Sequence, residues 1–304
     1  MNNLRKMAEP NPISLSRVKK SFGSITAVDG LDLEVPAGIC LGLLGPNGAG
    51  KSTTMRLLTG QAIADSGELS VLGYELPRES KMARARMGVV PQLDNLDVDV
   101  TVEENLMVFA RLYRVKDRPA AVDRALELAR LTDRRTDAVD ELSGGMRRRL
   151  LLARGLVHEP DVVLLDEPTV GLDPQIRTQM WTLIDDLRTR GATILMSTHY
   201  IEEAERLADE VAVMAQGKIV DRGKPSELIT KHAGRETAEV YGPPARLAEV
   251  RSAAEAEGLK ARPAGPAVAI VGAPRDNPVI PEDAVWRAAT LEDVFVILTG
   301  EEAE

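Results

Sequence analysis

Cysteine is almost missing from this chain, which has Cys40 and no other among its 304 residues. A single cysteine excludes a disulfide within the chain, and no CxxC pair or cysteine-histidine cluster suggests a structural metal. Disulfides persist mainly in oxidising compartments. We therefore expect Cys40 to pack in the core and the protein to work in a reducing, cytosolic setting.

Long hydrophobic runs are missing as well. No apolar stretch approaches the roughly 18 residues that a membrane-spanning helix needs. The first thirteen residues are polar, unlike the apolar segment of a secretory signal. We expect that the chain does not itself cross a bilayer.

The chain also lacks an excess of basic charge. Its formal net charge is −9, and residues 236–304, with 13 acidic and 6 basic side chains, carry −7 of it. Broad nucleic-acid-binding surfaces are usually basic. We therefore expect no nucleic-acid partner.

Apolar residues are plentiful, at 44% of the chain, so a substantial core can form. Continuous apolar runs at residues 39–44, 162–165 and 192–196 read as buried strands, and residues 53–60 as a helix. Buried strands joined by helices favour a mostly parallel sheet covered on both faces. The predicted fold class is α/β.

The remaining segments divide the chain into domains. A capping-box pattern begins at Thr101, and the sequence is helical in pattern from there to residue 158, so we expect a helical subdomain at about residues 95–160. We place this insert within a first domain of residues 1–235. Residues 236–304 are expected to form a small α+β domain, because strand-like and helix-like segments alternate between prolines and glycines.

A complete phosphate-binding loop follows the first apolar run. The pattern G-x-x-x-x-G-K-[ST] lies between a predicted strand and a predicted helix, which is the context that this motif requires. Its main-chain N–H groups wrap phosphates, the lysine neutralises charge and the serine hydroxyl can bind Mg²⁺. The loop consists of Gly45, Pro46, Asn47, Gly48, Ala49, Gly50, Lys51, Ser52 and Thr53.

Two neighbouring carboxylates, Asp166 and Glu167, follow the apolar run at residues 162–165. Ligands of α/β sheets bind at the carboxyl ends of the strands. We therefore expect Asp166 to help hold Mg²⁺ and Glu167 to act as general base toward the attacking water.

A second anion site is predicted at Ser143, Gly144 and Gly145, which open a helix. Exposed N–H groups at the positive end of a helix attract an anion. One nucleotide does not need two phosphate sites, so the simplest interpretation is that two copies of the chain share their nucleotides.

Together these motifs resemble the ATP-binding cassette of ABC transporters, and the resemblance spans residues 13–232. The other elements of that family stand in order: Gln92 in VVPQ matches the Q-loop, Asp173 in GLD the D-loop, and His199 in STH the switch histidine. Phe22 stands where the family places an aromatic ring that stacks on adenine.

The resemblance implies a P-loop NTPase fold that uses ATP and Mg²⁺ and forms an ATP-dependent homodimer. It implies that Ser52, Gln92 and Asp166 hold the metal. It also implies that Lys51, Gln92, Glu167 and His199 are catalytic. The implied nucleotide-binding residues are Phe22, Gly45, Pro46, Asn47, Gly48, Ala49, Gly50, Lys51, Ser52, Thr53, Ser143, Gly144, Gly145 and Asp173.

One difference from the usual family signature indicates which members of the family this chain resembles. Met146 replaces the glutamine common at the end of the signature, and Arg147, Arg148 and Arg149 follow it. This form, together with residues 88–95, 102–111, 239–242 and 291–295, is similar to exporter cassettes of the nodulation-factor and daunorubicin-resistance type. We expect the arginine run to be solvated surface that serves intersubunit contacts.

The function implied is the ATPase subunit of an exporter of a drug, lipo-oligosaccharide or similar amphiphile, bound at the cytoplasmic face of the membrane to a separate integral-membrane permease. The alternative is a soluble cassette acting on ribosomes or nucleic acid. Translation-factor relatives carry two cassettes, and repair relatives insert long coiled coils, whereas only 92 positions separate Lys51 from Ser143 here. A regulator without turnover is disfavoured because Glu167 and His199 are both present. Whether the acidic tail is a regulatory or dimer-stabilising domain or a solvated appendage stays open.

Overall fold

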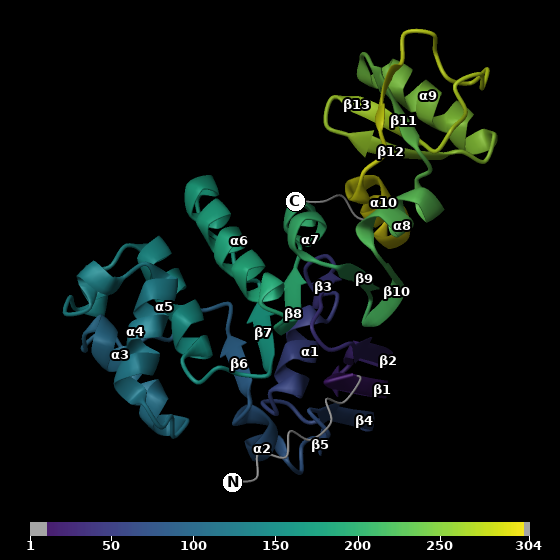
Figure 1. Cartoon of the computed structure of the whole chain (residues 1–304). Coiled ribbons are helices and arrows are strands. Elements are labelled where there is room, and N and C mark those ends of the chain that lie inside the picture. The colour runs from purple at the N-terminus through teal and green to yellow at the C-terminus, as the bar shows by residue number, and fades with distance from the viewer. Residues whose placement is uncertain (1–10, 301–304) are drawn as a thin grey trace.

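A computed structural model describes residues 11–300 as three sheets with helices packed around them (Figure 1). The strands are β1 (Ile13–Phe22), β2 (Ile25–Val35), β3 (Cys40–Leu44), β4 (Ser66–Val71), β5 (Tyr74–Glu75), β6 (Met87–Val90), β7 (Val162–Asp166), β8 (Thr193–Thr198), β9 (Glu210–Ala215), β10 (Lys218–Gly223), β11 (Glu236–Tyr241), β12 (Lys260–Ala264), β13 (Ala267–Val271) and β14 (Val285–Ala288). The helices are α1 (Lys51–Leu58), α2 (Ser80–Arg84), α3 (Val102–Leu112), α4 (Arg118–Ala129), α5 (Gly144–Leu156), α6 (Pro174–Thr189), α7 (Ile201–Leu207), α8 (Pro225–His232), α9 (Pro244–Ala256) and α10 (Leu291–Thr299), with short 3₁₀ helices η1 (Thr132–Arg134) and η2 (Val139–Glu141).

The central sheet has six strands in the order β10-β9-β3-β8-β7-β6. Its strands are parallel except β10, which pairs antiparallel with β9. Strands β3, β7 and β8 are almost entirely buried, as the apolar runs predicted, and Cys40 lies in the core at the start of β3. The α/β class is confirmed. Because these strands run parallel, their carboxyl ends share one edge of the sheet.

The antiparallel sheet of β2-β1-β4-β5 was not anticipated. Its first strand buries Ile13, Leu15 and Val18, which breaks the two-residue alternation expected of a half-buried strand. The break is a bulge: the pairing of β1 with β2 shifts between Leu15 and Val18, and Arg17 adopts a φ of 49°. A bulge of this kind removes the pattern by which the strand could be recognised.

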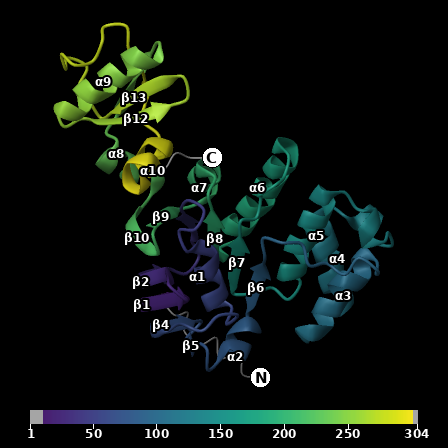
Figure 2. The ribbon, with the colours of Figure 1, turned by 180° about the vertical axis from the view of Figure 1, so that it is seen from behind.

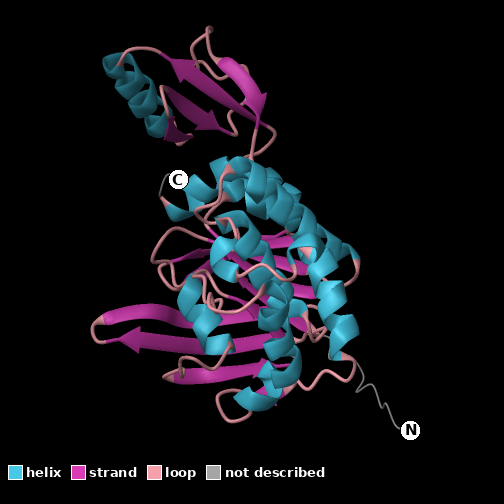
Figure 3. Cartoon of the chain, turned by 90° about the vertical axis from the view of Figure 1, so that its left-hand side faces the viewer, coloured by secondary structure: helices cyan, strands magenta, loops and turns pink. Residues whose placement is uncertain are grey.

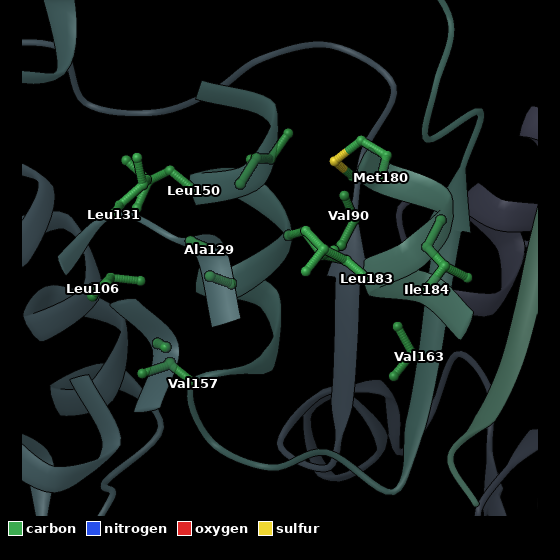
Figure 4. Close-up of a cluster of buried hydrophobic side chains, with 14 of the residues drawn as sticks. Val90, Leu106, Ala129, Leu131, Leu150, Val157, Val163, Met180, Leu183 and Ile184 are labelled. Carbon is green, nitrogen blue, oxygen red and sulfur yellow. The ribbon is translucent and has the colours of Figure 1, made fainter. Parts of the chain in front are cut away.

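The helical subdomain consists of α3, α4 and α5, beside the central sheet (Figures 1 and 2). Thr101 caps α3 through the predicted capping box with Glu104. The subdomain shares one apolar core with the sheet domain, and Figure 4 shows Leu106 and Leu150 of the insert in the same cluster as Val163 and Ile184. The insert is therefore packed against the sheet through a common core.

The C-terminal residues build a third sheet, β12-β13-β11-β14, with α9 against it (Figure 3). Helix α10 follows this sheet in the chain and packs on α7 and α8: Val294 and Phe295 share a core with Ala204 of α7 and Leu228 of α8. Within residues 11–300, no helix combines the length and the apolar character needed to span a membrane.

A buried ionic cluster joins α10 to the third sheet. Asp293 is fully buried and accepts hydrogen bonds from Arg262 of β12 (2.8 Å) and Arg287 of β14 (2.7 Å), and Thr237 of β11 donates to it at 3.1 Å. Burial raises the pKa of Asp293, but the bonds from Arg287, the Thr290 main chain and Arg262 outweigh it and hold the pKa at about 2. The carboxylate is thus charged and compensated on all sides.

We expect Asp293→Asn to lower the free energy of unfolding by up to about 3–5 kcal/mol, because it removes the buried charge shared by two arginines and leaves Arg287 with Glu239 and Arg262 with Glu292. Since the folded-state pKa lies below the usual 3.8, this stabilisation is present at neutral pH and is lost as the pH falls through about 2. Urea denaturation of the full chain, followed by tryptophan fluorescence, measures it.

The matched control is Asp283→Asn, which breaks an exposed pair with Arg246 in the same part of the chain. Exposed pairs contribute about 0–1 kcal/mol. Equal losses for both variants would contradict a structural role for the buried cluster.

Candidate functional site

The phosphate-binding loop lies where β3 ends and α1 begins, as predicted. Two of its glycines are packed too tightly for a side chain: a Cβ at Gly45 would lie 2.3 Å from the main-chain oxygen of Met214, and one at Gly50 would lie 2.2 Å from that of Ala27. Gly48 has a φ of 82° and open space beside it. The loop is held against β2 and β9, with Asn47 and Gly48 exposed, and the first N–H groups of α1 behind it have no partner within the helix.

Lys51 is buried at the first position of α1. Its Nζ donates to the carbonyl oxygens of Gly45 (2.6 Å) and Pro46 (2.9 Å) and lies 3.6 Å from Oε1 of Glu167. The ammonium therefore sits between the loop and the acidic end of β7, where phosphate charge would need to be offset.

Three predicted site residues that follow different strands meet at the Glu167 carboxylate, which is 6% exposed. Gln92, after β6, donates from Nε2 to Oε2 at 2.8 Å. Nδ1 of His199, after β8, lies 3.3 Å from Oε1. Together with Lys51, these groups surround a buried carboxylate with one cation, one amide donor and one imidazole. Gln92 is thus placed against Glu167, 75 residues further along the chain.

The main chain at Glu167 is in the left-handed region, with a φ of 45°. A residue other than glycine pays about 1–3 kcal/mol for such a conformation and keeps it only when its surroundings enforce it. Here the Glu167 N–H donates to both the carbonyl oxygen and the hydroxyl of Ser197 on β8, each at 3.1 Å. Strained main chain at a buried carboxylate is typical of a functional site.

Asp166 offers the oxygen ligands for a hard cation. Its Oδ1 accepts from the Ser197 hydroxyl at 2.6 Å and lies 3.5 Å from the Ser52 hydroxyl. Burial raises its pKa, against the opposing hydrogen bond from Ser197, and the neighbouring Glu167 raises it further. A carboxylate and a hydroxyl are ligands that Mg²⁺ prefers, and a bound cation would relieve the unfavourable burial of charge. A group of three or more His, Cys, Asp or Glu side chains around one point is not found in residues 11–300.

The predicted second anion site is at the N-terminus of α5. Ser143 caps this helix by accepting from the Met146 N–H at 3.3 Å, and Ser143 and Gly144 are exposed. The two glycines differ: a Cβ at Gly144 would meet nothing within 4 Å, whereas one at Gly145 would lie 2.7–2.9 Å from three atoms of Ile176 in α6. Gly144 is therefore accessible from solvent, and Gly145 must be a glycine because a side chain would collide with Ile176.

Two further predicted residues lie at the surface. Asp173 is exposed and caps α6 by accepting from the Ile176 N–H at 3.0 Å. Phe22 is 50% exposed at the tip of the β1–β2 hairpin, with Nζ of Lys20 5.2 Å from its ring centre. Strand β2 contacts the phosphate loop at Ala27, so the hairpin lies beside the loop. Adenine stacking by Phe22 stays a prediction.

The expectation of a solvated arginine run is wrong for Arg148. This side chain is 8% exposed and points into the protein, where it binds main-chain carbonyls beside Gln92 and Glu167. Its spacing of three from Gly145 and four from Leu152, both buried, is the helical period that could have identified it. Arg147 and Arg149 are half-buried, and Arg149 donates to the Ala129 carbonyl oxygen of α4 at 3.0 Å, so it too departs from a solvated intersubunit position. Sequence reasoning also missed Ser197, because its contacts exist only once β7 and β8 are paired.

Comparisons with known proteins agree with this architecture. The sequence model of a family described as ABC transporter matches residues 28–170. A relative from Paraburkholderia xenovorans, named Nod factor export ATP-binding protein I, is 45% identical over 298 residues, which cover 96% of this chain and 98% of the relative. A relative of the same name from Ralstonia nicotianae is 46% identical and covers 95% of this chain and 94% of its own length.

Solved structures that are similar to this chain are also ABC ATP-binding proteins. A dimeric ATP-binding cassette in a post-hydrolysis state, bound to ADP and Pi, has a TM-score of 0.63 and 25% identity, over 70% of this chain and 98% of the other. A component of an ABC transporter complex from Clostridium perfringens has a TM-score of 0.67 and 26% identity, over 73% of this chain and 92% of the other.

The packing at Gly145 gives a prediction about stability. We expect Gly145→Ala to destabilise the fold by about 1–3 kcal/mol, because the added methyl overpacks against Ile176. Adding Ile176→Ala should recover part of that loss, so that the double variant is more stable than the sum of the single changes predicts. Thermal denaturation measures each variant.

Gly144→Ala is the control, since its methyl would enter open space at a helical position where alanine is favoured over glycine. If Gly144→Ala lost as much stability as Gly145→Ala, or if the double variant were strictly additive, Gly145 would not be required by its packing against Ile176.

Proposed function

The chain belongs to the ATP-binding ATPases of the ABC transporter family, and we propose that it powers the export of a lipo-oligosaccharide, drug or similar amphiphile through a separate permease. The single observation that carries the catalytic part of the proposal is the convergence of Lys51, Gln92 and His199 on the buried Glu167 carboxylate. The export part is supported by the names of relatives about 45% identical over almost the whole chain.

Each residue at the site has a proposed role in hydrolysis. The loop at residues 45–53 wraps the phosphates with its N–H groups, and Lys51 offsets their charge. Glu167 accepts a proton from the attacking water, while Gln92 and His199 hold that carboxylate and the γ-phosphate in register. Phosphoryl transfer needs mainly positioning and charge stabilisation, which a cluster of buried polar groups supplies.

The Mg²⁺ that accompanies ATP fits the oxygen atoms of Ser52 and Asp166. When bound, the ion would neutralise charge on the phosphates. Gln92 donates from Nε2 to Glu167, so its amide oxygen is the end that is suited to the metal.

Two cassettes, most simply two copies of this chain, are proposed to enclose two nucleotides between them. Ser143 and Gly144 are exposed at the N-terminus of α5, and Asp173 is exposed at that of α6. In this arrangement the γ-phosphate held by one cassette completes the anion site of the other. ATP then joins the cassettes, and hydrolysis separates them.

The permease is proposed to dock on the exposed apolar side chains of the loop after β6 and of α3, which we propose act together as one patch. Leu93 is 78% exposed, Val98 41%, Val108 53% and Leu112 68%. Asn105 of α3 donates to the carbonyl oxygen of Asp97 at 2.7 Å and so joins the two segments. Docking there would hold the cassette at the cytoplasmic face of the membrane.

We also propose the division into a cassette, residues 1–235, and an accessory domain, residues 236–304. The sheet β11–β14 has its own apolar core with α9, which supports the division. Helix α10 packs with α7 and α8, so the accessory domain would be anchored to the cassette near the loop that carries His199.

Glu167→Gln should bind ATP, hydrolyse it about 10²–10⁴-fold more slowly and accumulate as an ATP-bound dimer, because the general base is lost and the phosphate contacts are kept. Phosphate release and size-exclusion chromatography with ATP measure the two effects. Glu127→Gln, an exposed change on α4, is the control. Turnover at the wild-type rate in Glu167→Gln would rule out the assigned role.

Val108→Asp and Leu112→Asp should abolish co-purification of a multi-span membrane permease from detergent-solubilised membranes, since each places a charge on the proposed apolar contact. Val220→Asp is the control, because Val220 is 45% exposed on β10, outside the patch. An unchanged thermal melt shows that each variant is folded. Co-purification of ribosomes or nucleic acid in place of a permease would favour the alternative function.

A further inference from the structure

Arg148 lies in the second turn of α5 and has no part in the hydrolysis, metal binding or docking proposed above. Its guanidinium donates to four main-chain carbonyl oxygens: Nε to Pro168 (2.6 Å), Nη1 to Pro91 (2.7 Å) and Gln92 (3.0 Å), and Nη2 to Glu167 (3.0 Å). All three nitrogens of the fork are engaged. Burying an arginine is costly unless its donors are satisfied, so this network is an organised feature of the fold.

The four carbonyls belong to two segments that are distant in sequence. Pro91 and Gln92 follow β6, and Glu167 and Pro168 follow β7. The side chains of these segments meet directly, since Gln92 Nε2 donates to Glu167 Oε2 at 2.8 Å. The guanidinium therefore fixes the two main chains from which the interacting side chains project.

The turn at Glu167 needs such support. Ser197 holds its N–H side from β8, and Arg148 holds its carbonyl side from α5. Two opposed contacts account for a left-handed residue at the acidic end of β7.

We infer that Arg148 is a positioning residue that sets Gln92 and Glu167 in register for hydrolysis and ties them to the helix carrying Ser143 and Gly144. This inference rests on the proposed roles of Glu167 and of the signature glycines. A planar fork with five rigid donors can bridge two segments at once, whereas an ammonium of lysine cannot match its geometry.

The test compares Arg148→Met with Arg148→Lys and with the control Arg149→Met. Methionine keeps aliphatic bulk and removes every donor, and lysine keeps the charge. Arg149 lies on the same helix and donates to the Ala129 carbonyl at 3.0 Å, toward α4, so its loss tests general damage to the helix. For each variant, kcat and KM for ATP, ATP binding and the melting temperature are measured on the full chain.

We expect Arg148→Met to lower kcat about 10–100-fold, because small misplacements of reacting groups have effects of that size, while KM for ATP stays within about threefold. Arg148→Lys should be intermediate, and Arg149→Met should keep the wild-type kcat. Wild-type kcat in Arg148→Met, or a parallel loss of kcat, ATP affinity and melting temperature in both methionine variants, would overturn the inference.

Arg148→Lys, which keeps the aliphatic length and the charge, covers the case in which Arg148→Met does not fold, and chemical rescue gives a further readout. Added ethylguanidinium should restore kcat in Arg148→Ala, where the truncation leaves room for it, and should leave Arg149→Ala unchanged. No rescue in a folded Arg148→Ala counts against the inference. Glu167→Gln, assayed alongside, separates the two hypotheses: full activity there removes the proposed function, whereas loss there with full activity in the Arg148 variants removes the positioning role alone.

Discussion

A carboxylate held almost out of water must be surrounded by donors and positive charge, and the arrangement around Glu167 answers that requirement. Its side-chain partners Lys51, Gln92 and His199 follow β3, β6 and β8. In the sheet, β6 and β8 are the neighbours of β7, and β3 lies next to β8. Parallel pairing brings those carboxyl ends to one edge. The order of strands is therefore what allows residues more than 100 positions apart, such as Lys51 and Glu167, to lie within 3.6 Å of each other.

Sequence alone could predict those parts of the site whose functional groups are consecutive in the chain. The phosphate loop, the Asp166–Glu167 pair and the helix opening at Ser143 each combine a strand or helix boundary with the reactive groups, so local pattern is sufficient. Ser197 and Arg148 act through contacts made across the sheet or between a helix and two loops. The helical period can place Arg148 on the buried face of α5, but the sequence around either residue does not indicate which groups it contacts.

The same distinction holds for the fold. Fully buried strands such as β3 and β7 appear as unbroken apolar runs, and α3 and α6 begin at recognisable caps. The antiparallel sheet has strands with one exposed face, and the bulge at Arg17 disturbs their alternation. The arginine run shows that tertiary contacts decide how deeply a side chain is buried. Three adjacent arginines on one helix range from half-buried, at Arg147 and Arg149, to almost fully buried at Arg148.

The return of α10 to the cassette has a consequence for the order in which the protein can be completed during synthesis. The apolar surface formed by Ala204, Val211 and Leu228 is covered by residues that the ribosome adds more than 60 positions later. At about 5–20 residues per second, that surface stays open for several seconds after the rest of the cassette has been made. A nascent chain that is stalled before residue 291 therefore exposes this apolar surface to chaperones and to other chains.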